Sequence, residues 1–333
     1  MTGLPHAGAG WRPTAMPEVL KLRATLLERI RAYFARHAVM EVDTPALSVA
    51  AATDPAIHSV STVRHGPGTA DGSRCYLHTS PEFPMKRLLA AGSGDIYQVC
   101  KVFRDHERGA WHSPEFTLLE WYRTGFDHLD LMDDVEQLLT GILADIAPVK
   151  SVDHWTYRDL FREHAGIDPF AADAGTLADA LAGRGIAVPA GMHDAPLDAW
   201  LDLCMTHLVE PRLGRGLLFV RDYPASQAAL ARLRSGNPPV AARFEAYLDG
   251  IELANGFHEL ADAGEQRRRF ARDNELRRQQ ALEPVPADEH LLAALRAGLP
   301  DCAGVALGMD RLLAVAGGVR SLDDVMAFPV ETA

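Results

Sequence analysis

The chain has 333 residues, of which 47% are apolar and 23% are charged, and its formal net charge is -12. This composition is typical of a globular protein that can bury a sizeable core, and it excludes a disordered chain. Because the charge is negative and no long Lys/Arg run offsets it, the sequence disfavours tight binding to a phosphate backbone and leaves only a local basic patch open.

The four cysteines lie far apart with no C-x-x-C pair, so the sequence indicates reduced thiols and gives no zinc or redox motif. No signal-like segment precedes Pro17, and no uncharged apolar run is long enough to span a bilayer. We therefore expect a cytoplasmic protein without a membrane partner. Its predicted organisation is a leader over residues 1–17 and one large domain over 18–333, with an insertion at about 171–215.

Apolar residues recur at helical spacing from Glu18 to His37, which predicts an amphipathic helix with a broad buried face. Pro45 then requires an extended segment. After a Gly/Pro-rich loop from Gly66 to Gly72, the stretches IYQVCKVFR and PEFTLLEWYR are predicted strands. The loop RDHERGAWHS between them is typical of a long-looped antiparallel hairpin.

In PEFTLLEWYR, successive side chains alternate between the two faces of the predicted strand. Phe116, Leu118, Glu120 and Tyr122 therefore share one face. A carboxylate buried without a partner costs several kcal/mol. This face is thus predicted either to be wet or to bind a cationic group.

Helices are also predicted from Leu129 to Ile146 and from Thr156 to His164, and an Arg-rich helix is predicted around Gln266 to Gln280. Strand patterns return at LLFVRDY and RFEAYLDGIELANGFHEL, and VALGMDRLLAVAGG predicts a strand, a glycine turn and a helix. Strands that pair in hairpins, apart from the helices, indicate an α+β fold with an antiparallel sheet flanked by helices. No glycine-rich phosphate loop of the parallel-sheet type is present.

Four stretches place polar groups in apolar surroundings: TSPEF, FRDHE with PEFTLLEWY, IELANGFHEL and GVALGMDR. Each has a structural explanation: a helix-start acid, an acid paired with an arginine, acids on exposed hairpin edges, and turn glycines at Gly304 and Gly308. Together they favour a ligand site. Arginines suit phosphate, paired carboxylates suit Mg²⁺ bridging phosphates, and glycines admit a close ligand.

VMEVDTPALS, FRDHERGAWHSPEFTLLEWY and GVALGMDRL resemble, in order, the three signature motifs of class II aminoacyl-tRNA synthetases. TSPEF, HSPEF and ELANGFHEL resemble the lysyl type, and the resemblance covers nearly the whole chain from Glu18. No anticodon-binding domain is expected before the first motif. The chain is most similar to the family of free-standing paralogs that attach (R)-β-lysine to a lysine side chain of elongation factor P, as IELANGFHEL, PDCAGVALGMDRL and PASQA indicate.

The resemblance implies ATP and Mg²⁺ as cofactors, β-lysine and elongation factor P as partners, a homodimer built through the first motif, and no tRNA. It assigns catalysis to Arg104, Glu252 and Arg311. The implied ATP-binding residues are Arg104, His106, Glu107, Ser113, Phe116, Glu252, Leu253, Gly308 and Arg311. The implied amino-acid-binding residues are Ser80, Pro81, Glu82, Glu120, Tyr122, Asn255, Glu259 and Ala306, with Glu252 and Glu259 holding the metal.

Within these sets, Arg104 would bind the α-phosphate and the substrate carboxylate, and Phe116 and Arg311 would sandwich adenine. Three positions depart from the family pattern. His106 replaces an adenine-contacting acid, for which Glu107 beside it could substitute after a small loop shift, and Ser113 replaces asparagine. If ATP binds weakly, these two positions are the first to test. Ala306 replaces glycine, and its methyl group is predicted to disfavour α-lysine by about 1 to 3 kcal/mol.

Two alternatives to a protein-modifying ligase stay open. The first is a truncated lysyl-tRNA synthetase that charges tRNA, and the second is a regulatory paralog without catalysis. The Arg-rich helix also has two interpretations, because acidic residues are interleaved among its arginines. It is either a solvated face or a docking surface for an acidic protein partner.

Overall fold

The computed structural model describes residues 11–66 and 72–333. Residues 1–10 of the expected leader and residues 67–71 of the Gly/Pro-rich loop lie outside the described residues. The chain divides into two compact units, each described here by itself. The first comprises Met1–Thr124, Ala261–Pro300 and Ala306–Ala333, and the second comprises Gly125–Leu260 and Asp301–Val305.

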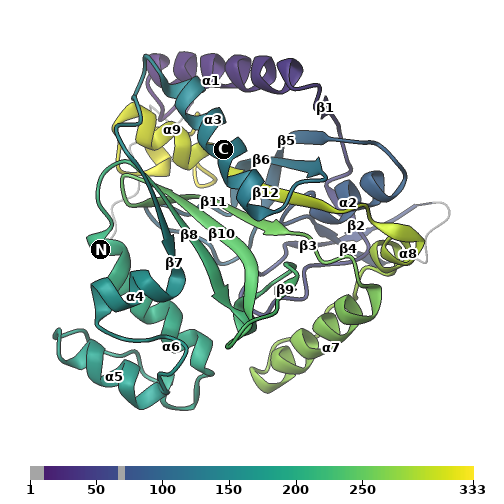
Figure 1. The fold of residues 1–333 in the computed structure, drawn as a ribbon. Coiled ribbons are helices and arrows are strands. Elements are labelled where there is room, and N and C mark those ends of the chain that lie inside the picture. The colour runs from purple at the N-terminus through teal and green to yellow at the C-terminus, as the bar shows by residue number, and fades with distance from the viewer. Residues whose placement is uncertain (1–10, 67–71) are drawn as a thin grey trace. The chain divides into compact units, whose positions relative to one another are not determined.

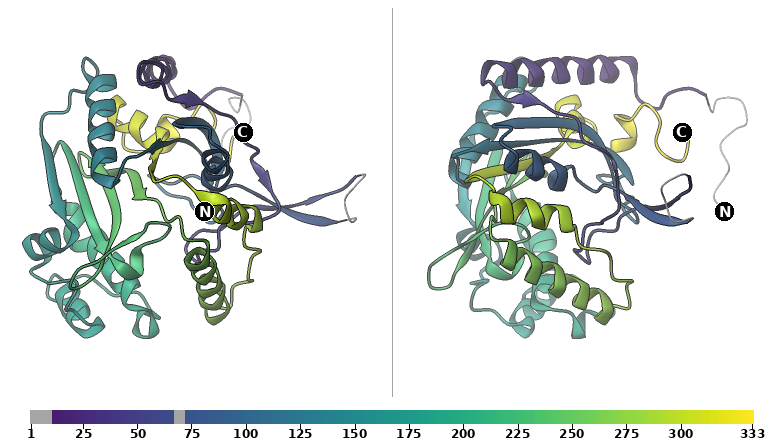
Figure 2. Two further views of the ribbon diagram at one scale, coloured as in Figure 1. Left: turned by 45° about the vertical axis from the view of Figure 1, so that its right-hand side comes forward. Right: turned by 90° about the vertical axis from the view of Figure 1, so that its right-hand side faces the viewer.

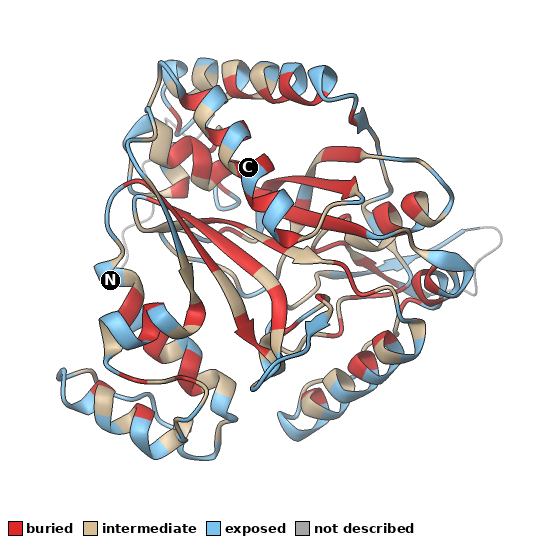
Figure 3. Cartoon of the chain, viewed as in Figure 1, coloured by how far each residue is buried: buried red, intermediate tan, exposed pale blue. Residues whose placement is uncertain are grey.

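The first unit opens with the helix α1 (Pro17–Arg36), which confirms the helix predicted from Glu18 to His37. Pro17 suits the first turn, where its missing N–H leaves no hydrogen bond unmade. Leu26, Ile30 and Phe34 form the buried stripe, visible in red along one side of α1 in Figure 3. The helix therefore holds its place through apolar burial.

The first unit contains three strands of a nine-stranded sheet, β1 (Met40–Glu41), β5 (Ile96–Phe103) and β6 (Glu115–Thr124), and a separate three-stranded sheet (Figure 1). β5 pairs antiparallel with β6, which confirms the long-looped hairpin, and parallel with β1. β4 (Ser73–Leu77) lies between β2 (Leu47–Ser48) and β3 (Ser61–Arg64), and its pairing with β3 forms a ribbon that projects from the rest of the unit in Figure 2. The other helices of this unit are α2 (Glu82–Ala90), α7 (Ala263–Gln279), α8 (Glu289–Gly298), α9 (Met309–Gly317) and the 3-10 turn η5 (Leu322–Asp324).

Asp310 joins three elements of the first unit. Its carboxylate, which is 1% exposed, accepts a hydrogen bond of 2.6 Å from the backbone N–H of Thr117 in β6 and another from the side chain of Arg23 in α1. A buried carboxylate requires such donors, and their loss would leave an uncompensated charge. Asp310 thus fixes the start of α9 against α1 and β6, next to Phe116 and Arg311.

The second unit contains the helix α3 (His128–Leu143), which starts at a capping box on Asp127 and confirms the helix predicted from Leu129. β10 (Val240–Leu248) pairs antiparallel with both β8 (Leu217–Pro224) and β11 (Ile251–His258), and β8 pairs parallel with β7 (Val152–Thr156). β9 (Leu233–Arg234) adds to β10, and β12 (Cys302–Gly308) begins in this unit beside β11.

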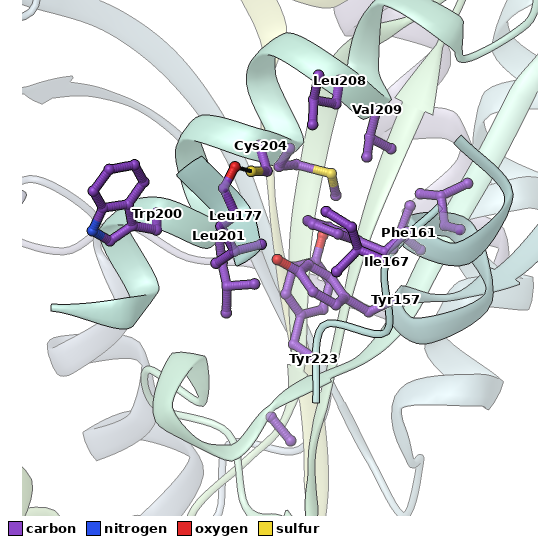
Figure 4. Close-up of a cluster of buried hydrophobic side chains, with 14 of the residues drawn as sticks. Tyr157, Phe161, Ile167, Leu177, Trp200, Leu201, Cys204, Leu208, Val209 and Tyr223 are labelled. Carbon is purple, nitrogen blue, oxygen red and sulfur yellow. Dashed lines mark hydrogen bonds between the residues drawn. The ribbon is translucent and has the colours of Figure 1, made fainter. Parts of the chain in front are cut away.

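Three short helices pack against one end of this sheet: α4 (Tyr157–Ala165), α5 (Ala174–Ala182) and α6 (Leu197–Cys204). They enclose a core in which Tyr157 and Phe161 meet Tyr223 of β8, while the Cys204 thiol contacts the carbonyl of Leu177 (Figure 4). The single-turn helices of the unit are η1 (Met192–Asp194), η2 (Met205–Val209), η3 (Glu210–Arg212) and η4 (Ala225–Gln227).

The predicted α+β class is confirmed, with one refinement. Hairpin pairs are antiparallel as expected, but β1 and β7 each join their neighbour in parallel. All four cysteines are free thiols, also as expected. Within residues 11–66 and 72–333, no helix combines the length and apolar character that crossing a membrane requires.

Candidate active site

Five predicted amino-acid-binding residues meet in the first unit, where β6 faces the start of α2. Ser80 donates a hydrogen bond of 2.7 Å to one oxygen of Glu120, and the Tyr122 hydroxyl donates one of 2.7 Å to the other. Ser80 also accepts the backbone N–H of Glu82 at 2.9 Å, while Pro81 caps α2. The TSPEF stretch and the β6 face therefore build one polar cluster.

Glu120 is 2% exposed, which rules out the wet face that the sequence left open. Burial, reinforced by the like charge of Glu82, raises the pKa of Glu120 to about 7. The hydrogen bonds from Ser80 and Tyr122 and the more distant ammonium of Lys86 only partly oppose this rise. A carboxylate in such a position favours a cationic ligand, because the positive charge of the ligand offsets the hydration that the carboxylate loses on burial.

Lys86 is a member of this cluster that the sequence reasoning missed. It lies in α2, is 1% exposed, and places its ammonium 2.5 Å from an oxygen of Glu82. The signal was present as the i, i+4 spacing of Glu82 and Lys86 on a helix. A buried lysine on one carboxylate lets Glu82 and Glu120 lie close together without two uncompensated charges.

Arg104 and Phe116, both predicted to bind the nucleotide, stack on each other in the first unit. The Arg104 guanidinium carbon lies 5.1 Å from the centre of the Phe116 ring, which is a cation–π arrangement. Arg104 also lies 3.7 Å from the carboxylate of Glu107 and donates to the carbonyl of Thr79 at 3.4 Å. A planar guanidinium held this way presents its remaining N–H groups to an oxyanion.

In the loop between β5 and β6, His106 and Glu107 differ in conformation and contacts. These two residues stand at or beside the position of the adenine-contacting acid in the family pattern. His106 adopts a left-handed backbone (φ 62°), and its exposed ring meets His58 edge-on at 5.1 Å. Glu107 instead faces Arg104. That Glu107 substitutes for the missing acid stays a prediction, which its position beside Arg104 supports, while Ser113 is buried.

Arg311 begins the first turn of α9, and its side chain is held by the same loop. Its Nε donates to the carbonyl of Trp111 at 3.1 Å, and a terminal nitrogen lies 3.1 Å from His112 Nε2. A side chain on Gly308 would meet Arg311 only at ordinary contact distance, 3.8 Å. Packing therefore does not require this glycine, which leaves space beside the Arg311 stem.

In the second unit, a β-bulge decides which side chains of IELANGFHEL share a face. Glu245 of β10 lies opposite Asn255 and Tyr247 lies opposite Glu252, so Leu253 is the extra residue. Without the bulge, the odd spacing of Glu252 and Asn255 would place them on opposite faces. With it, both lie on the face of Glu245, because directly opposed residues point the same way.

The same strand carries the two carboxylates of the predicted metal site. Glu252 lies near the start of β11, and Glu259 directly follows its end. That the two hold Mg²⁺ together stays a prediction. Glu245, a carboxylate the sequence reasoning missed, lies on the same face as Glu252 across the hairpin. Among residues 11–66 and 72–333, no cluster of three or more His, Cys, Asp or Glu side chains is preformed around a metal.

Glu259 follows β11 and is buried. Its backbone N–H donates to Cys302 at 3.0 Å, and its carbonyl accepts the Arg232 guanidinium at 3.1 Å. Ala306, in the part of β12 that belongs to the first unit, is half-buried. The backbone on both sides of these two positions is thus fixed by strand pairing.

The arginines of α7 are mostly neutralised within the first unit. Arg267 pairs with Glu289 at 2.6 Å, Arg278 pairs with Glu275 at 2.7 Å, and Arg268 and Arg269 both pair with Glu265. Arg277 is buried and donates to backbone carbonyls. This pairing favours a solvated, salt-bridged helix over a basic docking surface.

Comparison with known proteins adds to this geometry. The family described as tRNA synthetases class II (D, K and N) matches residues 7–332 of the chain. An elongation factor P–(R)-β-lysine ligase of Vibrio atlanticus is 49% identical over 320 residues, covering 96% of this chain and 98% of its own length. Ligases of the same name from Photobacterium profundum and Salmonella arizonae are 47% and 46% identical, over 97% and 98% of this chain and 99% of their own lengths.

Proposed function

Because this chain belongs to the class II tRNA synthetase family (D, K and N), we propose that it is an ATP-dependent ligase that attaches (R)-β-lysine to elongation factor P. The observation that carries the proposal is the buried carboxylate Glu120 beside Glu82, which suits an amino acid with an extra ammonium group. The names of the similar ligases support the acceptor.

The reaction has two steps. A carboxylate oxygen of β-lysine attacks the α-phosphorus of ATP, and pyrophosphate leaves as the mixed anhydride forms. The neutral ε-amine of the acceptor lysine then attacks the anhydride carbonyl, so that AMP leaves and the new amide loses a proton. In-line phosphoryl transfer depends on positioning and charge neutralisation, so no protein nucleophile is required.

In this proposal the first unit binds most of ATP. Arg104, stacked on Phe116 and steadied by Glu107, would contact the α-phosphate and the attacking carboxylate. Phe116 and Arg311 would hold adenine, with His106, Ser113 and Gly308 along the same loop and helix start. Guanidinium groups remain charged at any working pH, which suits stabilisation of a phosphoryl transition state.

Glu120, with Ser80 and Tyr122, would bind one ammonium group of β-lysine, and Glu82 would bind the other in exchange with Lys86. Asn255 and Glu259 are also proposed to contact the amino acid, and Ala306 to narrow the space available to it. Because burial and the charge of Glu82 outweigh the opposing effect of Lys86 on Glu120, Glu120 is the residue on which selectivity for a diamino acid depends most.

Mg²⁺ would be held by Glu252 and Glu259, because hard cations prefer carboxylate oxygens. The ion would neutralise charge on the phosphates of ATP. Leu253, as the bulge residue, would set the face on which Glu252 lies. We also propose that residues 18–333 act as one catalytic domain with residues 171–215 as its insertion.

We further propose a cytoplasmic homodimer. Met40, Leu47 and Val49, in the stretch that resembles the first motif, are exposed apolar side chains on the first unit. Exposed apolar side chains in this stretch support an interface between subunits. Light scattering of the purified protein would give the oligomeric state.

The proposal is tested by the intact mass of elongation factor P after incubation with this protein, Mg-ATP and (R)-β-lysine, with α-lysine in parallel. We expect one adduct, stronger with β-lysine, and no charging of bulk tRNA in a filter assay. Pyrophosphate exchange without an adduct would mean that adenylation is correct and the acceptor is wrong. Charging of tRNA would favour a truncated synthetase, and absence of exchange would favour a regulatory paralog.

A further inference from the structure

Arg243, in β10 of the second unit, contacts a residue that the proposed function places against the amino acid. Its Nε donates a hydrogen bond of 3.1 Å to Oδ1 of Asn255 on the neighbouring strand β11. One terminal nitrogen donates to the carbonyl of Gln227 at 2.8 Å, and the other donates to Glu245 at 2.5 Å. The guanidinium also lies 4.4 Å from the centre of the Tyr223 ring.

These contacts determine the orientation of the Asn255 amide. A guanidinium can only donate hydrogen bonds, so the side of Asn255 that faces Arg243 must be its oxygen. The NH₂ group therefore points away from Arg243. Asn255 can then offer a donor to an oxyanion, such as a carboxylate or an acyl phosphate, but it cannot offer its oxygen to an ammonium group there.

Arg243 is itself held on several sides. Glu245 is fixed by hydroxyl hydrogen bonds of 2.6 Å from Tyr223 and Tyr247. Gln227, whose carbonyl accepts from Arg243, donates its side chain to Asp202 of α6 at 2.7 Å. The PASQA stretch had no assigned role in the sequence. Its residue Gln227 thus provides hydrogen bonds that fix the position of the guanidinium.

We propose that Arg243 is a positioning residue that locks the Asn255 amide with its NH₂ group toward the carboxylate of the bound amino acid. The inference rests on the proposed function, in which Asn255 contacts that substrate. Arg243 itself does not need to touch the substrate. A lysine in its place would keep the charge but could not span Asn255, Gln227 and Glu245 with one planar group.

The test is a double-mutant cycle in ATP–pyrophosphate exchange with β-lysine, using wild type, Arg243→Lys, Asn255→Ala and the double variant. We expect each single variant to raise the KM for β-lysine about tenfold or more, with the KM for ATP within about twofold of wild type. In the Asn255→Ala background, Arg243→Lys should add almost nothing. Equal effects of Arg243→Lys in both backgrounds, or no effect in wild type, would overturn the proposal.

Asn255→Asp tests the polarity of the amide in a variant expected to fold, because a carboxylate still accepts from Arg243. It replaces the donor by an acceptor, so the KM for β-lysine should rise at least as much as in Asn255→Ala. A KM like that of wild type would contradict the assigned orientation.

Arg158→Lys is the matched control, since Arg158 also bonds a carboxylate, Asp168, at 2.6 Å and lies 5.5 Å from an aromatic ring, that of Phe170. It should lower thermal stability without changing either KM. If the wild type activates a different amino acid instead of β-lysine, the proposed function fails, and the same cycle measured with that amino acid still decides the role of Arg243.

Discussion

Two buried glutamates, one in each unit, differ in a single partner. Glu120 of the first unit and Glu245 of the second each accept hydrogen bonds from two hydroxyl groups, at 2.6 to 2.7 Å. Glu245 also has a guanidinium at 2.5 Å, whereas the charge that acts most strongly on Glu120 is the carboxylate of Glu82, opposed more weakly by the ammonium of Lys86. A carboxylate that is bonded to a counter-ion stabilises the fold, and one whose neighbouring cation is bonded to another carboxylate is suited to bind a further cation.

The groups whose pKa is raised also differ between the surroundings of the two glutamates. Burial, together with the charge of Glu245, raises the pKa of the Tyr223 and Tyr247 hydroxyls, which therefore stay protonated as donors. Around Glu120, burial acts on the carboxylate itself and raises its pKa. The charge of Glu245 is thus compensated when the protein folds, whereas the charge of Glu120 would be compensated when a cationic ligand binds.

The largest predicted effect is on stability. Glu245→Ala should lower the free energy of unfolding by about 3 to 5 kcal/mol, because it leaves Arg243 and two tyrosine hydroxyls without their acceptor. Glu120→Ala should cost only about 1 to 2 kcal/mol, since it also removes the repulsion with Glu82. Denaturant unfolding of both variants measures the difference, and equal losses would remove the distinction drawn between the two glutamates.

Glu120→Gln tests the ligand side of the comparison. The amide keeps the shape of the carboxylate but loses its charge, so the KM for β-lysine should rise about ten- to a hundredfold while the KM for ATP changes little. Steady-state pyrophosphate exchange separates the two constants. A parallel rise in both would mean that Glu120 supports the fold of the site and not the amine.

The contrast between these glutamates could be anticipated from the sequence only in part. The hairpin β5–β6, the closing strand and helix, and the identity of Glu120 as an unusual acid all follow from alternation and motif order. Local patterns cannot give its burial, because that depends on α2 packing over it. They also cannot give Lys86 on Glu82, although the helical spacing was readable.

In the second unit, alternation alone does not describe the strand where it is irregular. Strict alternation separates Glu252 from Asn255, and only the bulge at Leu253 returns them to one face. Arg243, Gln227 and Glu245 meet through pairing between strands, which a single strand's pattern does not contain. The same is true of Arg23 and Asp310, whose contact joins distant parts of the chain.

A pH dependence follows from the shift on Glu120. Its pKa in the folded protein, about 7, is above its ordinary value of 4.5, so below pH 7 the empty site holds a protonated, neutral carboxyl. An ammonium ligand needs the ionised form, and its binding then releases a proton. The apparent affinity for β-lysine should therefore fall as pH drops below about 7, by up to tenfold per pH unit.

This dependence is measured by the KM for β-lysine between pH 5.5 and 8.5, with Glu120→Gln as the control. In that variant the KM should be higher but nearly flat over the same range. A slope that survives in Glu120→Gln would assign the titration to another group, such as an amine of the substrate.

A smaller effect is expected at Ala306. Removal of its methyl group in Ala306→Gly should favour α-lysine over β-lysine by about 1 kcal/mol, a several-fold change in the ratio of their kcat/KM values. The carboxylates Glu82 and Glu120 remain, so both amino acids should still be activated. An unchanged ratio of the two kcat/KM values would show that Glu82 and Glu120 alone distinguish the positions of the amines.

The smallest effect is predicted for α7, where Arg267, Arg268, Arg269 and Arg278 already have acidic partners. Simultaneous replacement of Arg267, Arg272 and Arg278 by alanine should lower stability by less than about 1 kcal/mol, because exposed ion pairs contribute little. Modification of elongation factor P should stay within about twofold of wild type. If modification fell tenfold while pyrophosphate exchange was unchanged, α7 would be a docking surface. Its arginines would then have to exchange their acidic partners within the chain for acidic side chains of elongation factor P. In that case α7, like Glu120, would form ion pairs with another molecule.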